Sequence, residues 1–344
     1  MRKAASKRAR HLRAAQGRRA RLGVLGVLVG LVVVAVASVI AGSRGLIVPT
    51  VFGGKGPLED ELLTSLRLPR MAAGMIVGGA LAAAGLLVQS VTRNPLGDPG
   101  LLGVASGALL GGVLAKSVWG IGGTELVWPC IAGALAATAF VLFSASRRGP
   151  NFAGVNLILI GMAVNAVLGG AVAVITLGSP TTFATLRFWI AGSLAGRTSG
   201  AVLVALVLVI PALALTLLLH RQLDVLALGA DRARSLGVRP EPVLAFIVLI
   251  VAWLVGTATA LAGPIAFVGL AAPHLGRAIG RSPDHARLII LTVAIGAGLV
   301  TGADLVGRLW AAPGEVSVAI VCAIGGAPFL IAIGLRMGSY GRLA

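Results

Sequence analysis

The sequence predicts an all-α membrane protein that crosses the bilayer about ten times. Of its 344 residues, 57% are hydrophobic and only 12% are charged, and the mean hydropathy is +0.99. Soluble domains carry roughly 25% charged residues. Apolar runs of about twenty residues, the length that one helix needs to cross a bilayer, recur along nearly the whole chain. These observations exclude a soluble globular domain.

The basic residues are unevenly distributed along the chain. The formal charge is +18, from 29 Lys and Arg against 11 Asp and Glu, and such a charge would ordinarily suggest nucleic-acid binding. Nine of the basic residues lie within positions 1–21, where there is no acid. The positive-inside rule interprets this segment as a basic cytosolic tail. A cleaved signal peptide is the competing interpretation, but the following apolar run of about twenty residues exceeds the usual signal core of about 7 to 15.

Ten membrane spans are predicted from the apolar runs, which are separated by charged segments or by segments rich in Pro or Gly. The third and eighth spans are short for a full crossing of the bilayer. They are therefore candidates for half-length helices that other parts of the protein shield from lipid. The domain organisation is then a tail over 1–21, a transmembrane domain over 22–338 and a C-terminal tail over 339–344. The predicted spans are 22–42, 71–91, 99–115, 126–146, 152–177, 199–219, 243–262, 265–280, 285–308 and 316–337.

The orientation of these spans is predicted by counting basic residues on each side. With the N-terminus inside, the inner segments hold 21 Lys and Arg and the outer segments hold 8. Without the tail the ratio is still 12 to 8. We therefore expect an even number of spans with both termini in the cytosol.

The spans themselves carry little chemistry. No predicted span has an Asp, Glu or Lys near its centre, which disfavours a proton- or ion-coupled secondary transporter or a channel. A membrane-embedded enzyme would need paired carboxylates, a His cluster or a nucleophile with its base, and the acids lie at span ends or in loops. His274 has no second metal ligand at suitable spacing, and Cys130 and Cys322 are expected to be small packing residues. The spacing of Gly103, Gly107 and similar glycines predicts tight helix packing.

Basic residues also cluster just before the second span, at 66–70 (LRLPR). Pro69 suits the first turn of a helix, where its missing N–H costs nothing. Arg67 and Arg70 would oppose the dipole of a helix beginning there, so we expect an acidic partner or lipid phosphates at the outer face. Arg308 adds a third cation at the same surface. The alternative is that these side chains simply extend to the membrane interface.

The segment 94–100 (NPLGDPG) predicts a helix start. Asp98 is suited to accept hydrogen bonds from the first amides of the next helix, and Pro99 suits its first position. We assign this motif a structural role.

The longest inner loop, 221–242, is amphipathic. Apolar residues such as Leu223 and Leu226 alternate with charged ones, and Gly229 and Gly237 can terminate two short helices. The loop is either an ordinary solvated connector or a pair of helices that inserts into a cytosolic partner.

Four sequence blocks follow one another along the chain. RLPR is followed by GGALAAAGLLVQSVTRNPLGDPGLLGVASGA, and then by FWIAGSL at 188–194, LGADRARSLGV at 228–238 and GPIAFVGLAAPHLGR at 263–277. In this order the blocks resemble the FecCD family of permease subunits, the membrane components of ABC importers for iron–siderophore complexes, haem and cobalamin. The resemblance covers more than three-quarters of the chain. Gly97 replaces an alanine of the family pattern, and Ser317 and Ala319 replace a proline and a glycine.

The resemblance implies a type II ABC importer permease with ten transmembrane helices. It also implies a second permease subunit, identical or paralogous, two cytosolic ATPase subunits, a substrate-binding protein outside, and a place in the bacterial cytoplasmic membrane. The family's docking arginines correspond to Arg67, Arg70 and Arg308. The family's coupling segment corresponds to Leu228, Gly229, Ala230, Asp231, Arg234, Leu236 and Gly237.

The leading hypothesis is a translocation subunit of an ATP-driven ferric-siderophore importer. No GxxxxGK[ST] loop occurs, so ATP is expected on the partner subunits, and we expect no catalytic or metal-binding residue and no directly bound cofactor. An importer of haem or cobalamin with the same architecture is the alternative.

Overall fold

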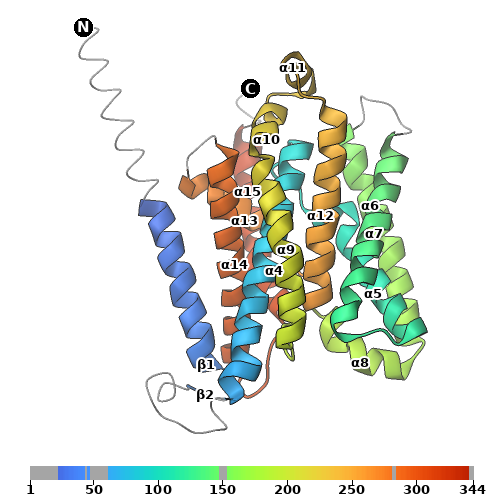
Figure 1. The fold of residues 1–344 in the computed structure, drawn as a ribbon, viewed down its shortest axis with the longest axis vertical. Helices are drawn as coiled ribbons and strands as arrows, with labels where there is room; N and C mark the ends of the chain where they lie inside the picture. The colour runs from blue at the N-terminus through green and yellow to red at the C-terminus, as the bar shows by residue number, and fades with distance from the viewer. Residues whose placement is uncertain (1–21, 43–44, 47–60, 147–152, 281–283, 341–344) are drawn as a thin grey trace.

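The computed structural model describes residues 22–42, 45–46, 61–146, 153–280 and 284–340. Within these ranges the chain forms thirteen α-helices, most of them aligned with the long axis of the molecule (Figure 1). The predicted basic tail, 1–21, lies outside the described residues. The α-helices are the N-terminal helix Leu22–Ile40, α4 (Leu68–Thr92), α5 (Val104–Trp119), α6 (Val127–Ser146), α7 (Ala153–Leu177), α8 (Pro180–Ile190), α9 (Ser199–Leu218), α10 (His220–Ala227), α11 (Ala230–Ser235), α12 (Pro240–Ala262), α13 (Val268–Gly280), α14 (His285–Trp310) and α15 (Val318–Tyr340).

Five short elements accompany the α-helices. A π-helical segment precedes α4, and 3-10 turns precede α5 and α6. The two short strands pair antiparallel directly after the N-terminal helix, with Ala41 opposite Leu46. These elements are η1 (Leu62–Arg67), η2 (Pro99–Leu102), η3 (Gly123–Leu126), β1 (Ala41–Gly42) and β2 (Gly45–Leu46).

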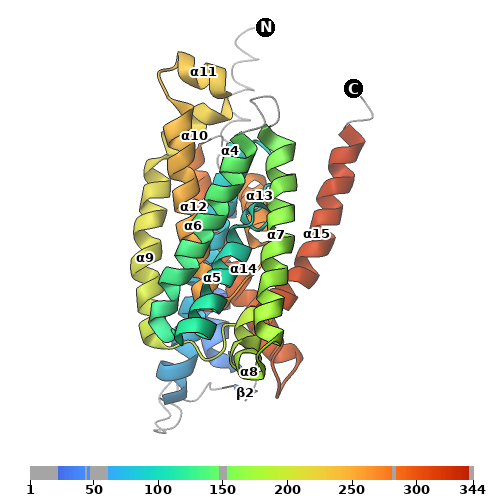
Figure 2. The ribbon, with the colours of Figure 1, turned by 90° about the vertical axis from the view of Figure 1, so that its right-hand side faces the viewer.

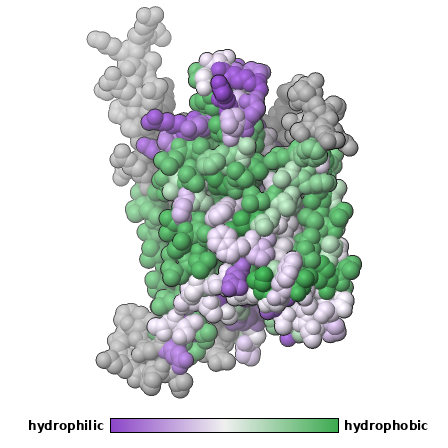
Figure 3. Space-filling view, turned by 45° about the vertical axis from the view of Figure 1, so that its right-hand side comes forward, coloured by the Kyte–Doolittle hydropathy of each residue, from purple (hydrophilic) through white to green (hydrophobic). Residues whose placement is uncertain are grey.

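Each of the ten predicted spans corresponds to one helix. Seven of the described helices are long and apolar enough to cross a membrane. The other three spans are α5, α13 and α15, and α5 and α13 have only 16 and 13 residues, as predicted for the third and eighth spans. On the face shown in Figure 3, apolar side chains cover much of the bundle and more polar ones gather toward its ends, which suits a lipid environment.

Three local features differ from the sequence prediction. The second span does not begin near residue 71, because η1 and α4 form one helical stretch, Leu62–Thr92. The amphipathic helix α8 was missed, although Ser179 accepts a hydrogen bond from Thr182 N and Pro180 occupies its first turn. Helix α15 ends at Tyr340, two residues beyond the predicted end of the transmembrane domain at 338.

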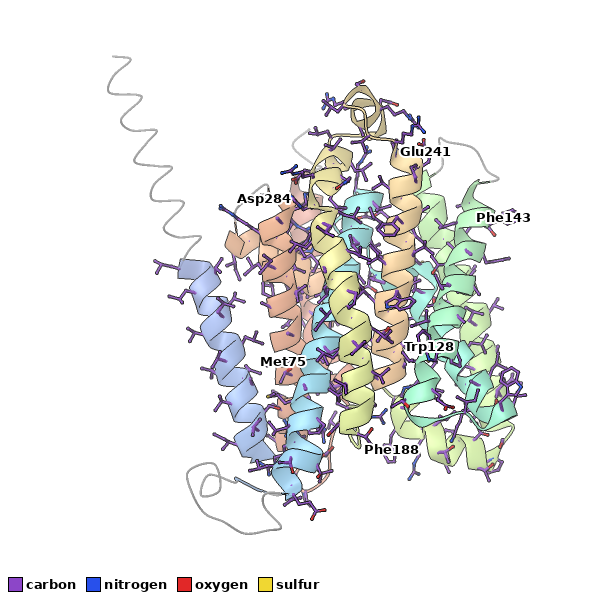
Figure 4. The ribbon with its side chains drawn as sticks, viewed as in Figure 1. Met75, Trp128, Phe143, Phe188, Glu241 and Asp284 are labelled. Atoms are coloured by element: carbon purple, nitrogen blue, oxygen red, sulfur yellow. The ribbon has the colours of Figure 1, made fainter. Side chains whose placement is uncertain are left out.

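The two ends of the bundle differ in composition and are named here for later use. The loop end carries α10 and α11, and the start of α12 and α14 (Figure 1). The arginine end carries β1, β2, η1 and α8, at the opposite end of the bundle (Figure 1). Figure 4 places Glu241 and Asp284 near the loop end and Phe188 near the arginine end.

Helix α4 is the centre of the core. Ala73, Val77, Ala80 and Leu87 on it are fully buried, and α12, α13 and α14 all pack against it. The closest approaches occur at glycines: a Cβ on Gly78 would lie 2.1 Å from the carbonyl oxygen of Gly296 in α14. The two backbones are therefore in direct contact. This close packing stabilises the helix pair in lipid, where the hydrophobic effect does not drive helices together.

The predicted small-residue packing is also seen between α5 and α6. A Cβ on Gly107 would lie 2.4 Å from the carbonyl oxygen of Gly133, and one on Gly111 would lie 2.2 Å from that of Pro129. The turn that leads into α5 is confirmed as well, because Asp98 accepts a hydrogen bond of 2.7 Å from Gly100 N. The element it caps is the 3-10 turn η2, with Pro99 in its first turn.

Two helices lie at the edge of the bundle. Only 6% of the apolar window of the N-terminal helix is buried, and in Figure 1 that helix stands beside the remainder. Figure 2 shows α15 apart from α5, α6 and α7. Side-chain hydrogen bonds from Arg67 and Arg308 reach the last turn of the N-terminal helix at the arginine end.

Candidate partner-binding sites

The arginine end holds a compact group of charged side chains, called here the arginine cluster: Arg67, Arg70, Asp304, Arg308 and Glu315. Arg70 is its centre, because its Nε and Nη2 donate to the Asp304 carboxylate at 2.9 to 3.1 Å. The third nitrogen, Nη1, donates to the Glu315 carboxylate at 2.8 and 3.0 Å. Such a forked pairing fits the planar guanidinium.

Arg308 lies deeper in the cluster. Its side chain is 4% exposed, and its Nε is 3.1 Å from Asp304 Oδ2 without forming a hydrogen bond. Its other nitrogens donate to Ser38 O (3.1 Å), Ala41 O (3.0 Å) and Ser38 Oγ (2.6 Å). Arg308 thereby joins α14 to the end of the N-terminal helix.

Arg67 binds the same helix end. Its Nη1 donates to the carbonyl oxygens of Val39 (2.9 Å) and Ile40 (2.6 Å). The last carbonyls of a helix have no partner within it and carry partial negative charge, so cations are favourable there. Arg67 and Arg308 therefore satisfy the C-terminal end of the N-terminal helix.

This geometry corrects the sequence argument about Arg67 and Arg70. They do not lie at a helix N-terminus, because η1 extends the helix upstream. Their counter-charges and acceptors also lie within the chain, in Asp304, Glu315 and backbone carbonyls. The spacing of Asp304 and Arg308 at i and i+4 was the available signal for such pairing. The three predicted docking arginines nevertheless lie together, and the five residues of the cluster carry a net charge of +1.

The predicted coupling segment lies at the loop end. Gly229 (φ +115°) and Gly237 (φ +81°) follow the ends of α10 and α11, as predicted for two short helices. Leu223 and Leu226 of α10 are buried against the bundle, whereas Leu228 and Leu236 are 52% and 61% exposed. Exposed leucines on a projecting segment are typical of a surface that contacts another protein (Figure 1).

Charged residues hold α11 to the start of α12. Arg234 donates to Glu241 at 2.6 Å and to Asp231 at 3.2 Å. The hydrogen bond to Glu241, followed by the charge of that carboxylate and those of Asp231, raises the pKa of the Arg234 guanidinium. Because these side chains are exposed, the pairs orient α11 more than they stabilise the fold.

The polar residues within the spans serve helix contacts. Arg277 donates to Gln89 Oε1, and Gln89 Nε2 donates to Gly269 O at 3.3 Å. Asn165 Nδ2 donates to Gly100 O at 2.6 Å. His274 Nδ1 is 3.1 Å from the Leu270 carbonyl oxygen, and no group of three potential metal ligands occurs among the described residues. The side chain of Asn156 lies outside the described part of the chain.

Comparison with known proteins decides the family. A sequence model described as the FecCD transport family matches residues 22–336. The chain belongs to the FecCD transport family. It is accordingly a multi-pass permease subunit of an ABC importer, and it is not itself a catalytic subunit.

Relatives in this family differ in their cargo. The chain is 40% identical over 315 residues to the ferric enterobactin transport system permease protein FepD of Escherichia coli K12, covering 90% of this chain and 94% of that one. It is 35% identical over 322 residues to the hemin permease HmuU of Yersinia pestis, with coverage of 92% and 95%. It is 33% identical over 325 residues to the vitamin B12 permease BtuC of Klebsiella pneumoniae, with coverage of 93% and 96%.

A solved structure has the same fold. It is described as an inward-facing conformation of an ABC transporter of metal-chelate type, and it matches with a TM-score of 0.80 and 29% sequence identity. The match covers 91% of this chain and 98% of the other. The predicted type II importer permease fold is therefore confirmed.

Proposed function

We propose that this permease translocates ferric-siderophore complexes across the bacterial cytoplasmic membrane. The observation that carries the proposal is the 40% identity to the ferric enterobactin permease over 90% of the chain. Identities to the hemin and vitamin B12 permeases are lower, at 35% and 33%. Haem or cobalamin is the alternative cargo.

The cargo is tested by uptake in cells that lack the gene, with and without the gene restored. We expect uptake of ⁵⁵Fe-labelled siderophores from a panel of catecholates and hydroxamates to fall on deletion and to return on complementation. Haem and cobalamin uptake, measured in the same strains, should stay unchanged. Unchanged siderophore uptake with loss of haem or cobalamin uptake would reject the iron assignment.

We propose that the loop end docks two cytosolic ATPase subunits in a complex with a second permease subunit, identical or paralogous. The exposed Leu228 and Leu236 would enter a groove on the ATPase. Leu236→Asp should abolish co-purification of the ATPase, while Leu177→Asp, at an exposed leucine three residues before α8, should not. Retained, tightly coupled transport in Leu236→Asp would favour the solvated connector. Mass spectrometry of the intact complex identifies the second permease.

The arginine end is proposed as the outer docking face for a substrate-binding protein, with both chain termini in the cytosol. Carboxylates of that protein would complement the excess positive charge of the cluster. Arg67→Glu and Arg70→Glu should weaken docking and reduce its salt dependence, measured as dissociation constants across a salt series. Arg239→Glu, at an exposed arginine of the loop end, is the control. Undiminished affinity in both cluster variants would retire this role.

A further inference from the structure

A partly buried contact at the loop end joins the proposed ATPase-binding segment to α14. His285, the first residue of α14, has its Nδ1 only 2.5 Å from Asp224 Oδ1 of α10. The same carboxylate oxygen accepts a hydrogen bond of 3.2 Å from the His285 backbone N–H. The side chain of His285 is 14% exposed. One carboxylate on α10 thus holds both the backbone and the ring of the residue that begins α14.

The other nitrogen of the ring faces α4. His285 Nε2 is 3.4 Å from Ser90 Oγ, and the Ser90 hydroxyl is 2.8 Å from the Leu86 carbonyl oxygen, to which it donates. The imidazole therefore lies between α10 and α4. A displacement of α10 cannot leave the first turn of α14 in place without breaking the contact to Asp224.

The opposite end of α14 carries two members of the arginine cluster. Asp304 holds Arg70, and Arg308 holds the end of the N-terminal helix. The helix has 26 residues and contains no proline, so it extends about 39 Å without an interruption of its hydrogen bonds. Its backbone contact with α4 at Gly296 and Gly78 leaves it little freedom to bend.

We propose that α14 is the element that couples the two partner surfaces. In this proposal, which rests on the proposed function, Asp224 and His285 transfer the movement of α10 to α14. Asp304 and Arg308 then transfer it to Arg70 and to the docking face. Coupling between two sites requires one element whose position both sites influence, and α14 is bonded at each of its ends to one of the two surfaces. Asp224 and His285 are positioning residues in this scheme.

A purely structural role for Asp224 makes a different prediction. Asp224 would then stabilise the start of α14 as any capping carboxylate does, and its loss would lower stability without changing the communication between the sites. The discriminating quantity is the ratio of the binding protein's dissociation constants with and without a non-hydrolysable ATP analogue. The measurement uses the complete complex of permease and ATPase in lipid nanodiscs.

Asp224→Ala should bring this ratio close to one. In the unaltered complex we expect a ratio within the range of about 5 to 150 that is typical of coupled sites. Asp224→Asn keeps an oxygen that can accept from the ring and should give an intermediate ratio. The matched control is Asp284→Ala, which removes the carboxylate that caps the same helix end through Ala286 N and should keep the original ratio.

The inference is overturned if Asp224→Asn and Asp224→Ala keep the ratio of the unaltered complex. Should the alanine variant fail to assemble, the asparagine variant alone decides in the same way. Failure of the proposed function would give another result. In that case the unaltered permease would bind neither an ATPase nor a binding protein. The two failures are therefore distinguishable.

Discussion

Replacing Arg308 by alanine should loosen the attachment of the N-terminal helix to the bundle, with Arg67 left to hold the helix end. The side chain is 4% exposed and donates three hydrogen bonds to Ser38 and Ala41. Breaking a buried charge pair costs about 3 to 5 kcal/mol. We expect Arg308→Ala to lower the free energy of unfolding by about 3 kcal/mol, at the lower end of this range, because Arg70 still neutralises Asp304. Arg308→Glu should be worse, since it would bring a second carboxylate close to Asp304.

The assay is denaturant unfolding of the purified chain in detergent, followed by tryptophan fluorescence, together with hydrogen exchange over residues 22–42. The control is Arg187→Ala in α8, where an exposed guanidinium lies 4.7 Å from the centre of the Phe188 ring. Losing that contact should cost about 0.5 to 1 kcal/mol. Exchange in the N-terminal helix should rise in Arg308→Ala only. Equal midpoints and equal exchange in the two variants would refute the assigned role of Arg308.

Three further predictions concern packing and turns, and each is measured by the same unfolding assay. Gly78→Ala should destabilise the protein by about 1 to 3 kcal/mol, because the new methyl group would collide with the backbone of Gly296. The control Gly170→Ala has open space around the new methyl group and should be neutral or stabilising by up to about 1 kcal/mol. Equal effects would contradict the close helix contact. Asp98→Ala should cost about 1 kcal/mol through loss of the bond from Gly100 N, and Asp98→Asn should restore most of it. Trp189→Phe should cost about 1 kcal/mol, because Trp189 Nε1 donates to carbonyl oxygens of α12 at 2.9 and 3.1 Å, and no change would show that these bonds contribute nothing.

The sequence predicted the features that depend on local composition. Apolar length located the ten spans, and the glycines of the 221–242 loop located the ends of α10 and α11. Asp98 and Pro99 predicted the turn before α5. These signals are local because each arises from hydrogen-bond requirements or polarity within a few residues.

The features that the sequence did not predict depend on contacts between distant segments. Arg70 and Glu315 are 245 residues apart, and Asp224 and His285 are 61 apart. Polar spacing along one helix cannot indicate such pairs. The macrodipole argument for Arg67 was wrong for a related reason, since a π-helical segment extended the helix beyond the expected start. That argument did predict that acidic partners were needed, but it did not find them within the chain.

The bonds of Arg308 also bear on the order in which the chain is assembled. Ser38 and Arg308 are 270 residues apart, so at about 5 to 20 residues per second the ribosome needs on the order of 10 to 50 s to supply the second partner. Arg67, only 27 residues from Ile40, emerges much sooner. In lipid, a helix makes its backbone hydrogen bonds within itself, so the N-terminal helix can remain in the membrane before Arg308 is synthesised. The N-terminal helix therefore gains the contacts of Arg308 late in synthesis, and chains released before residue 308 would leave it held by Arg67 without Arg308.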